Sequence, residues 1–186
     1  MEQPITADDI SRDLIHFIAK SPSTFHGIKA ALLYAGFTEI REEDTWQIEK
    51  GGKYVVTRNG SALMAFTVPQ EGAEAFHITA SHCDSPTFKI KEDPELADGP
   101  YVKLNVEGYG GMIMSTWLDR PLSVAGRLLV TENGHLAEKL VAIDGTMLVI
   151  PSVAIHMDRS VNQHKEWKVQ KDMLPLYGMT GAKTPF

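Results

Sequence analysis

The sequence predicts an α/β first region followed by a β-rich, antiparallel second region. Apolar residues recur at helical spacing in the stretch that ends at Gly36, short apolar runs then flank the turn signal Asn59-Gly60, and strict alternation begins at Tyr101. Between the two regions, residues 92–100 are acidic, contain two prolines and have little apolar content, which is typical of an exposed crossing between domains. We therefore expect a first domain over 1–94 and a second over 95–186.

Two helices are expected at the start of the chain. Thr6 and Asp9 have the spacing of a capping box, which predicts an amphipathic helix that continues to about Lys20 with an inward face of Ile10, Leu14, Phe17 and Ile18. A second helix is expected after residues 21–24, and Gly36 is expected to end it as a C-cap.

Short strands follow the helices. We expect three of them, at 46–49, 53–57 and 63–68, joined through Gly51-Gly52 and through the hairpin signal Asn59-Gly60. The apolar run 76–80 predicts a buried strand that leads directly into His82. Helices and strands together make the first region α/β.

The second region alternates apolar and polar residues. Strands are expected at 101–107, 122–130, 136–143 and 146–150, with turns at Asn133-Gly134 and Asp144-Gly145. No helical spacing of similar strength occurs before Pro151. The sequence therefore predicts an antiparallel β-meander here.

Composition limits the function. The net charge is −6 and the pI is near 5.6, without a local cluster of lysines and arginines, which argues against a nucleic-acid partner. No run of about eighteen apolar residues predicts a membrane span, and the first nine residues lack the basic and apolar parts of a secretion signal. The single cysteine, Cys83, suits a reducing compartment. We expect a cytoplasmic protein with no membrane partner.

His82 and Asp84 form a candidate metal site. Side chains at i and i+2 of an extended segment leave the same face, so the Asp84 carboxylate can accept the Nδ1 proton of His82 and leave Nε2 free to bind zinc or a similar ion. A hydrogen-bonded structural histidine is the alternative, and the triplet alone leaves both open. A Cys83 thiol nucleophile is disfavoured, because adjacent side chains of a strand point to opposite faces.

Two other polar pairs invite a catalytic reading. Glu42-Glu43 lies in a polar stretch and is expected to be a solvated loop. Asp119-Arg120 is expected to form a hydrogen-bonded ion pair or cap at the start of the meander, near the chemistry but outside it.

Three segments together resemble the aspartyl aminopeptidases, which are dinuclear zinc exopeptidases that remove N-terminal acidic residues. The segments are 81–86 (SHCDSP), 110–122 (GGMIMSTWLDRPL) and 150–156 (IPSVAIH), in matching order and spacing. Residues 21–26 (SPSTFH) and 170–176 (QKDMLPL) add two shorter matches. The resemblance thus extends over nearly the whole chain.

The resemblance implies part of an α/β catalytic domain followed by an inserted, β-rich dimerisation domain. His82 then resembles the first zinc ligand, Asp84 the carboxylate that orients it, and His156 a histidine that extends into a neighbouring subunit's active site. It further implies two zinc ions in each complete site, a peptide substrate with an acidic N-terminus, and a homo-oligomer built from dimers.

A two-metal site needs more donors than His82, because each zinc takes about four ligands. The resemblance implies that the remaining ones, which include a Glu-Glu pair, follow the inserted domain and lie beyond Phe186. We therefore expect the 186-residue chain alone to be inactive. The alternative is that it is a non-catalytic, truncated fragment that acts as an assembly or dimerisation module.

Overall fold

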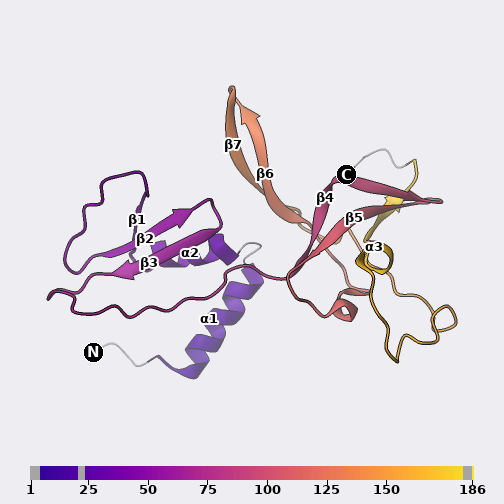
Figure 1. The fold of residues 1–186 in the computed structure, drawn as a ribbon, viewed down its shortest axis with the longest axis horizontal. Coiled ribbons are helices and arrows are strands. Elements are labelled where there is room, and N and C mark those ends of the chain that lie inside the picture. The colour runs from indigo at the N-terminus through magenta and orange to yellow at the C-terminus, as the bar shows by residue number, and fades with distance from the viewer. Residues whose placement is uncertain (1–4, 21–23, 182–185) are drawn as a thin grey trace. The chain divides into compact units, whose positions relative to one another are not determined.

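The computed structural model describes residues 5–20, 24–181 and 186, which fall into two compact units. Unit 1 comprises Met1–Ser85 and unit 2 comprises Pro86–Phe186. Helices and a small sheet make up unit 1, and antiparallel strands dominate unit 2 (Figure 1). The predicted mixture of helices and sheets is confirmed. None of the helices in the described ranges is both long enough and apolar enough to cross a membrane.

Helix α1 (Ala7–Lys20) begins at the predicted capping box. The Asp9 N–H donates to Thr6 Oγ1 at 3.2 Å, and the Thr6 N–H donates to Asp9 Oδ2 at 3.1 Å. Hydrogen bonding from the Thr6 side chain holds the pKa of Asp9 below its usual range. The prediction that the apolar face of this helix is buried is wrong for three of its four residues, since Ile10, Leu14 and Ile18 are exposed.

Helix α2 (Thr24–Tyr34) ends as predicted. Gly36 has a φ of 84°, and the Phe37 N–H donates to the Leu32 carbonyl at 3.0 Å, so the chain turns in the left-handed region that glycine adopts readily. Most of the expected start of this helix, residues 21–23, lies outside the described residues.

Strands β1 (Thr38–Ile40), β2 (Lys53–Arg58) and β3 (Ala62–Thr67) form the sheet of unit 1 in the order β1-β2-β3. β1 is parallel to β2, and β3 is antiparallel to it. The hairpin prediction at Asn59-Gly60 is confirmed, with φ of 52° and 62° at the two turn residues.

The strand predicted at 46–49 is wrong, since these residues are irregular and β1 occupies that edge of the sheet. Trp46 explains the conformation: its ring stacks on Phe66 at 6.1 Å, and its indole N–H donates to the Arg41 carbonyl at 2.7 Å. These contacts take the place of strand pairing.

The buried strand predicted at 76–80 is also wrong. Residues 71–86 contain no regular element, and Phe76 is 89% exposed. A strand needs a neighbour to receive its backbone hydrogen bonds, and no strand in the described part of the chain pairs with this run. The composition of this run does not specify a pairing partner.

Unit 2 is built on the sheet β4-β5-β8, formed by β4 (Thr87–Asp98), β5 (Tyr101–Tyr109) and β8 (Leu176–Met179). Both pairings are antiparallel. The exposed crossing predicted over 92–100 is wrong, because β4 continues to Asp98 and turns at Gly99-Pro100 into β5. The two compact units divide between Ser85 and Pro86, whereas the predicted domain boundary lies between residues 94 and 95.

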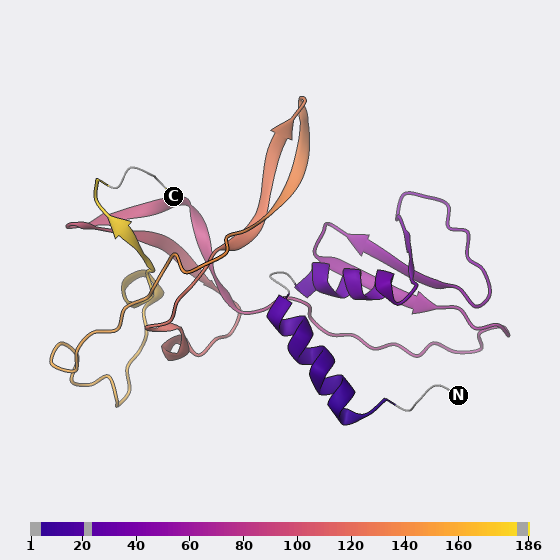
Figure 2. The same ribbon diagram turned by 180° about the vertical axis from the view of Figure 1, so that it is seen from behind.

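Strands β6 (Ala125–Glu132) and β7 (His135–Ala142) form a separate hairpin around the predicted turn Asn133-Gly134. This hairpin extends away from β4 and β5 in both ribbon views (Figures 1 and 2). The predicted strand at 146–150 exists only as isolated bridges to Leu118, Leu122 and Leu176. The second region is thus antiparallel, as predicted, but it is not one continuous meander.

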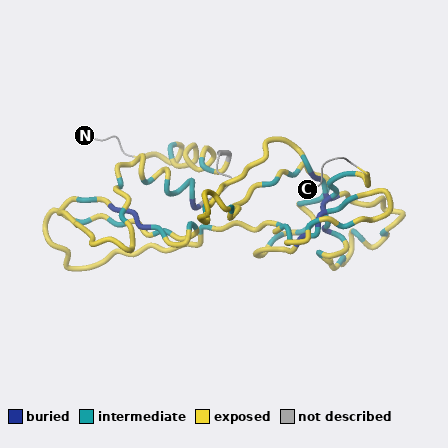
Figure 3. The backbone as a smooth tube through the Cα atoms, turned by 90° about the horizontal axis from the view of Figure 1, so that it is seen from above, coloured by how far each residue is buried: buried dark blue, intermediate teal, exposed yellow. Residues whose placement is uncertain are grey.

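Buried residues lie in several short stretches of the tube, with some in each unit (Figure 3). In unit 1 they are Phe25, Tyr54, Val55 and Val56. In unit 2 they include Leu104, Val106 and Leu148, which form one cluster, together with Ile150 and Met173. The short helix α3 (Val169–Asp172) and the 3₁₀ turn η1 (Met114–Trp117) complete this unit.

Candidate metal-binding site

His82 lies in the extended, irregular segment that follows β3. Its neighbour Cys83 donates its thiol hydrogen to the Ser61 carbonyl at 3.3 Å, which ties the segment to the β2–β3 hairpin turn. Adjacent side chains of an extended chain leave on opposite sides, and the His82 side chain is 82% exposed. The backbone is thus held on the Cys83 side while the imidazole faces outward.

Asp84 contacts the His82 ring as predicted. His82 Nδ1 lies 3.0 Å from Asp84 Oδ1 and 3.0 Å from the Asp84 carbonyl oxygen. Neither oxygen can donate, since one belongs to a carboxylate and the other to the backbone, so Nδ1 must carry the proton. In the neutral ring Nε2 then has a free lone pair, which is the form of histidine that binds a metal.

The donors in the described residues do not make a complete metal site. No group of three or more His, Cys, Asp and Glu side chains within residues 5–20, 24–181 and 186 could hold an ion. Zinc takes about four ligands, and here one imidazole is prepared for it by one carboxylate. The chemistry of His82 and Asp84 fits one corner of a zinc site, and a complete site would need ligands besides those in the described residues.

His156 belongs to unit 2, whereas His82 and Asp84 belong to unit 1. It lies in the turn at 155–157, which the Met157 N–H closes by donating to the Ala154 carbonyl at 2.8 Å. Its side chain is exposed. The structure thus brings His82 and Asp84 together and places His156 on an exposed turn of the other unit.

Asp119 and Arg120 make structural contacts. Asp119 has a φ of 54°, and its Oδ1 accepts the Ser152 N–H at 2.8 Å. Arg120 Nη1 donates to the Thr116 carbonyl at 3.3 Å. These contacts fit the expected structural role, but the expected ion pair does not form between the two within the described residues. Asp119 accepts from the backbone of Ser152, and Arg120 donates to the carbonyl four residues before it.

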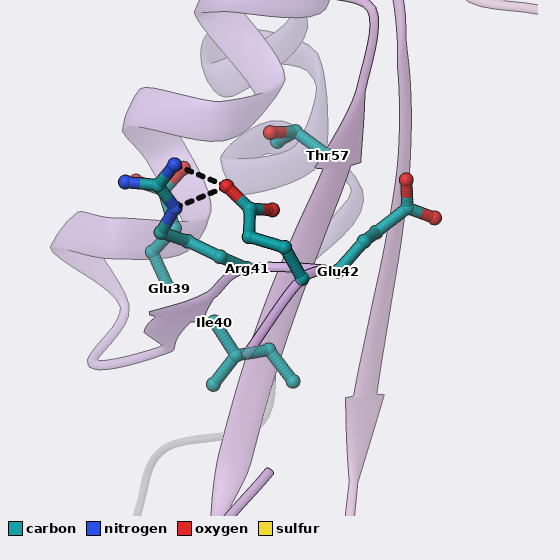
Figure 4. Close-up of a pocket in the computed structure, with 6 residues that line it drawn as sticks. Glu39, Ile40, Arg41, Glu42 and Thr57 are labelled. Atoms are coloured by element: carbon teal, nitrogen blue, oxygen red, sulfur yellow. Dashed lines mark hydrogen bonds and ion pairs between the residues drawn. The ribbon is translucent and has the colours of Figure 1, made fainter. Parts of the chain in front are cut away.

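A polar pocket of about 550 Å³ lies beside β1 and includes the Glu42-Glu43 pair (Figure 4). Arg41 pairs with Glu43, Arg58 with Glu42, and Lys29 with Glu39. Hydrogen bonding from Arg58 holds the pKa of Glu42 below its usual range, so this carboxylate stays ionised. The pocket contains no histidine or cysteine, and its acids are paired and exposed, as expected for a solvated loop.

Comparison with known proteins identifies the family. Residues 17–185 match the sequence model of the family described as "Aminopeptidase I zinc metalloprotease (M18)". The chain is 48% identical over 183 residues to "Probable M18 family aminopeptidase 2" of Clostridium acetobutylicum, covering 94% of this chain and 42% of that protein. It is 37% identical to "Aspartyl aminopeptidase 4" of Saccharomyces cerevisiae, covering 99% of this chain and 39% of that one.

Solved structures agree with the sequence comparisons. The chain matches the cryo-EM structure of the Ape4 and Nbr1 complex with a TM-score of 0.84 and 35% identity, over 92% of this chain and 34% of that one. It matches the S. cerevisiae mApe1 dodecamer with a TM-score of 0.68 and 27% identity, over 91% of this chain and 38% of that one. The chain therefore spans about two fifths of the length of the relatives it matches.

The matched region covers nearly the whole chain, includes the histidine whose Nε2 is left free by Asp84, and belongs to relatives named as aminopeptidases. The chain belongs to the M18 family of zinc metallo-aminopeptidases.

Proposed function

We propose that the protein containing this chain releases N-terminal Asp or Glu residues from peptides by two-zinc-assisted hydrolysis. The observation that supports it most is the His82–Asp84 contact, since it fixes the ring form that binds zinc within a zinc-protease family. The acidic substrate preference is supported by relatives named aspartyl aminopeptidase in yeast and in Ricinus communis.

In this proposal His82 binds one zinc ion through Nε2, and Asp84 holds the ring in the required orientation. When bound, zinc supplies Lewis-acid chemistry that polarises the peptide carbonyl. His156 acts at a neighbouring subunit's site, where a hydrogen-bonding imidazole can stabilise the substrate or the developing oxyanion. Its exposure on a turn supports this role.

The other metal ligands and the general base belong to the remaining three fifths of the protein in this proposal. The exposed apolar run 76–80 supports such a division, because it is suited to pair with strands that the described residues do not supply. We accordingly propose that the 186-residue chain does not hydrolyse peptides alone.

We also propose a homo-oligomer built from dimers through unit 2. One structural relative is titled a dodecamer. The β6–β7 hairpin exposes Leu129 and Leu136, and an isolated two-stranded hairpin is only marginally stable in water, which favours its burial against another chain. A cytoplasmic location is part of this proposal.

The β6–β7 hairpin also favours a second candidate function, in which the chain works as an assembly module without catalysis.

Hydrolysis by the complete enzyme tests the proposed activity. With matched peptides that differ only at the first residue, kcat/KM is expected to be at least about 10-fold higher for Asp or Glu than for Leu or Lys. A site built to bind a carboxylate has polar groups that lose their partner when the first residue of the peptide is Leu or Lys. Chelation is expected to abolish turnover, and added zinc to restore it.

The purified 186-residue chain is the matched control for this assay. It is expected to show no turnover with or without zinc, and to self-associate in sedimentation experiments. Chelator-sensitive hydrolysis by this chain would overturn its assignment as an incomplete site, and equal rates on all four peptides would overturn the acidic preference.

A further inference from the structure

The segment that bears His156 is a long loop. It leaves the buried residue Ile150, contains the turn at 155–157 and returns to the sheet of unit 2 through α3. In Figure 2 the segment bulges outward from the sheet between these two points. Loops of this length without regular structure are uncommon and are usually functional when ordered.

Asp119 holds the start of this loop at two points. Its backbone N–H donates to the Ile150 carbonyl at 2.9 Å, and its Oδ1 accepts the Ser152 N–H at 2.8 Å. The two bonds bracket Pro151, which has no N–H of its own. Asp119 reaches this position only with a φ of 54°, which Asn, Asp and Gly tolerate better than other residues.

Lys165 holds the far side of the loop. Its Nζ lies 2.6 Å from Asp158 Oδ2, 3.8 Å from Asp172 Oδ1 and 4.4 Å from the centroid of the Trp167 ring. The Lys165 side chain is only 17% exposed, so these contacts are screened less than those of a surface pair. Hydrogen bonding to Lys165 holds the pKa of Asp158 below its usual range.

Both anchors are connected to the core of unit 2. Ile150 is buried, and the adjacent Val149 exchanges backbone hydrogen bonds with Leu176 of β8. On the far side, Asp172 ends α3, from which Gln170 donates to the Val106 carbonyl of β5. The loop is thus fastened to the same sheet before and after His156.

The turn at 155–157 lies in the sequence between the residues that these two anchors hold, Ser152 and Asp158. The His156 side chain is exposed and has no hydrogen bond or ion pair among the described residues. A histidine left free on a loop that is fastened on both sides is suited to act on something outside its own unit.

We propose that Asp119 and Lys165 are positioning residues that together hold the 150–158 loop so that His156 is presented in one fixed direction to a neighbouring subunit's substrate. The inference rests on the role proposed for His156 above. Preorganisation is the physical reason: a free loop of this length would sample many positions of the imidazole, and a displacement of about 1 Å can cost up to 100-fold in rate.

A variant series in the complete, zinc-loaded enzyme separates the acceptor from the backbone strain at Asp119. Asp119→Gly keeps the left-handed backbone and removes the acceptor, whereas Asp119→Asn keeps both. Asp119→Gly and Lys165→Met are each expected to lower kcat/KM about 10-fold or more, with Asp119→Asn within about threefold of the parent. Lys171→Met is the matched control, since Lys171 lies on exposed surface of α3, and it is expected to have no effect.

A double-mutant cycle with His156→Ala distinguishes positioning from general destabilisation. In the His156→Ala background, Asp119→Gly is expected to cause no further loss of kcat/KM, because the group that it positions is gone. The ¹H–¹⁵N spectrum of residues 150–157 is expected to broaden in Asp119→Gly while zinc content stays unchanged.

Three results would overturn the inference. One is an unchanged kcat/KM in Asp119→Gly and Lys165→Met together with a lowered kcat/KM in His156→Ala. That result would remove the anchors but leave the proposed role of His156 intact. A second is full additivity in the cycle. The third is an unimpaired His156→Ala, which would remove the role proposed for His156 and with it the need for anchors.

Discussion

Replacing His82 with alanine is expected to lower kcat/KM of the complete enzyme by at least about 10³-fold, because a zinc site that loses one of about four ligands loses both affinity and geometry. The zinc content after dialysis is expected to fall by about one ion per subunit. Activity on an Asp-initiated peptide and zinc content by mass spectrometry measure the two effects. His16→Ala is the matched control, since His16 is an exposed histidine on α1 with no role in the proposed site or assembly.

Asp84 variants give a graded comparison for the same site. Asp84→Ala removes the carboxylate that accepts from Nδ1 and is expected to lower zinc affinity about 10- to 100-fold, with a smaller loss in Asp84→Asn, which retains an acceptor oxygen. Unchanged zinc affinity in His82→Ala would show that the ring is structural. Equal losses in His82→Ala and His16→Ala would show that the effect is not specific to this site.

Replacing Leu104 with alanine is expected to lower the free energy of unfolding of unit 2 by about 2 to 5 kcal/mol. Leu104 is 0% exposed on β5 and clusters with Val106 and Leu148, so the smaller side chain leaves a cavity in the core that fastens the His156 loop. Urea unfolding followed by fluorescence of Trp117 and Trp167 measures the change.

Ile113→Ala is the control for that measurement. Ile113 is 71% exposed in unit 2 outside the β6–β7 hairpin, and its truncation is expected to change the free energy of unfolding by less than about 0.5 kcal/mol. Equal destabilisation by the two variants would contradict the assignment of Leu104 to the core.

Local chemistry explains which elements could be predicted from the sequence. The capping box of Thr6 and Asp9, the C-cap at Gly36 and the Asn-Gly turns at 59–60 and 133–134 each depend on a few neighbouring residues, and the structure confirms all of them. The alternation of apolar and polar residues is sufficient to predict β5, because one face of that strand packs on the core of its own unit.

The elements that the sequence predicted wrongly depend on pairing between strands that are far apart in the sequence. The run 76–80 is apolar enough for a buried strand, yet no described strand pairs with it. Residues 92–98 have the composition of an exposed linker, but they belong to β4, which pairs with β5. The register of this pairing shifts between Ile90 and Glu95, and the shift accommodates the extra residues of β4. The short β8 carries too little alternation to be recognised, and its place is set by β5.

The contacts of the candidate site also differ in how far the sequence predicts them. The contact of His82 with Asp84 follows from two-residue spacing, which holds in an extended segment even without a sheet. The Asp119–Ser152 bond joins residues 33 positions apart, and the Lys165 anchor depends on how the loop folds back on itself. The sequence marks Asp119 through its neighbour Arg120, but no local pattern identifies Ser152 as its partner or Lys165 as an anchor.

A crystal structure of the complete enzyme loaded with zinc, with ions located by anomalous scattering at the zinc edge, tests most directly whether His82 is a metal ligand. We expect an ion about 2.0 to 2.1 Å from His82 Nε2, with Nδ1 still within hydrogen-bonding distance of Asp84. Zinc ions bound by other residues while the His82 ring stays in solvent, or an ion on Nδ1 with Asp84 displaced, would contradict it.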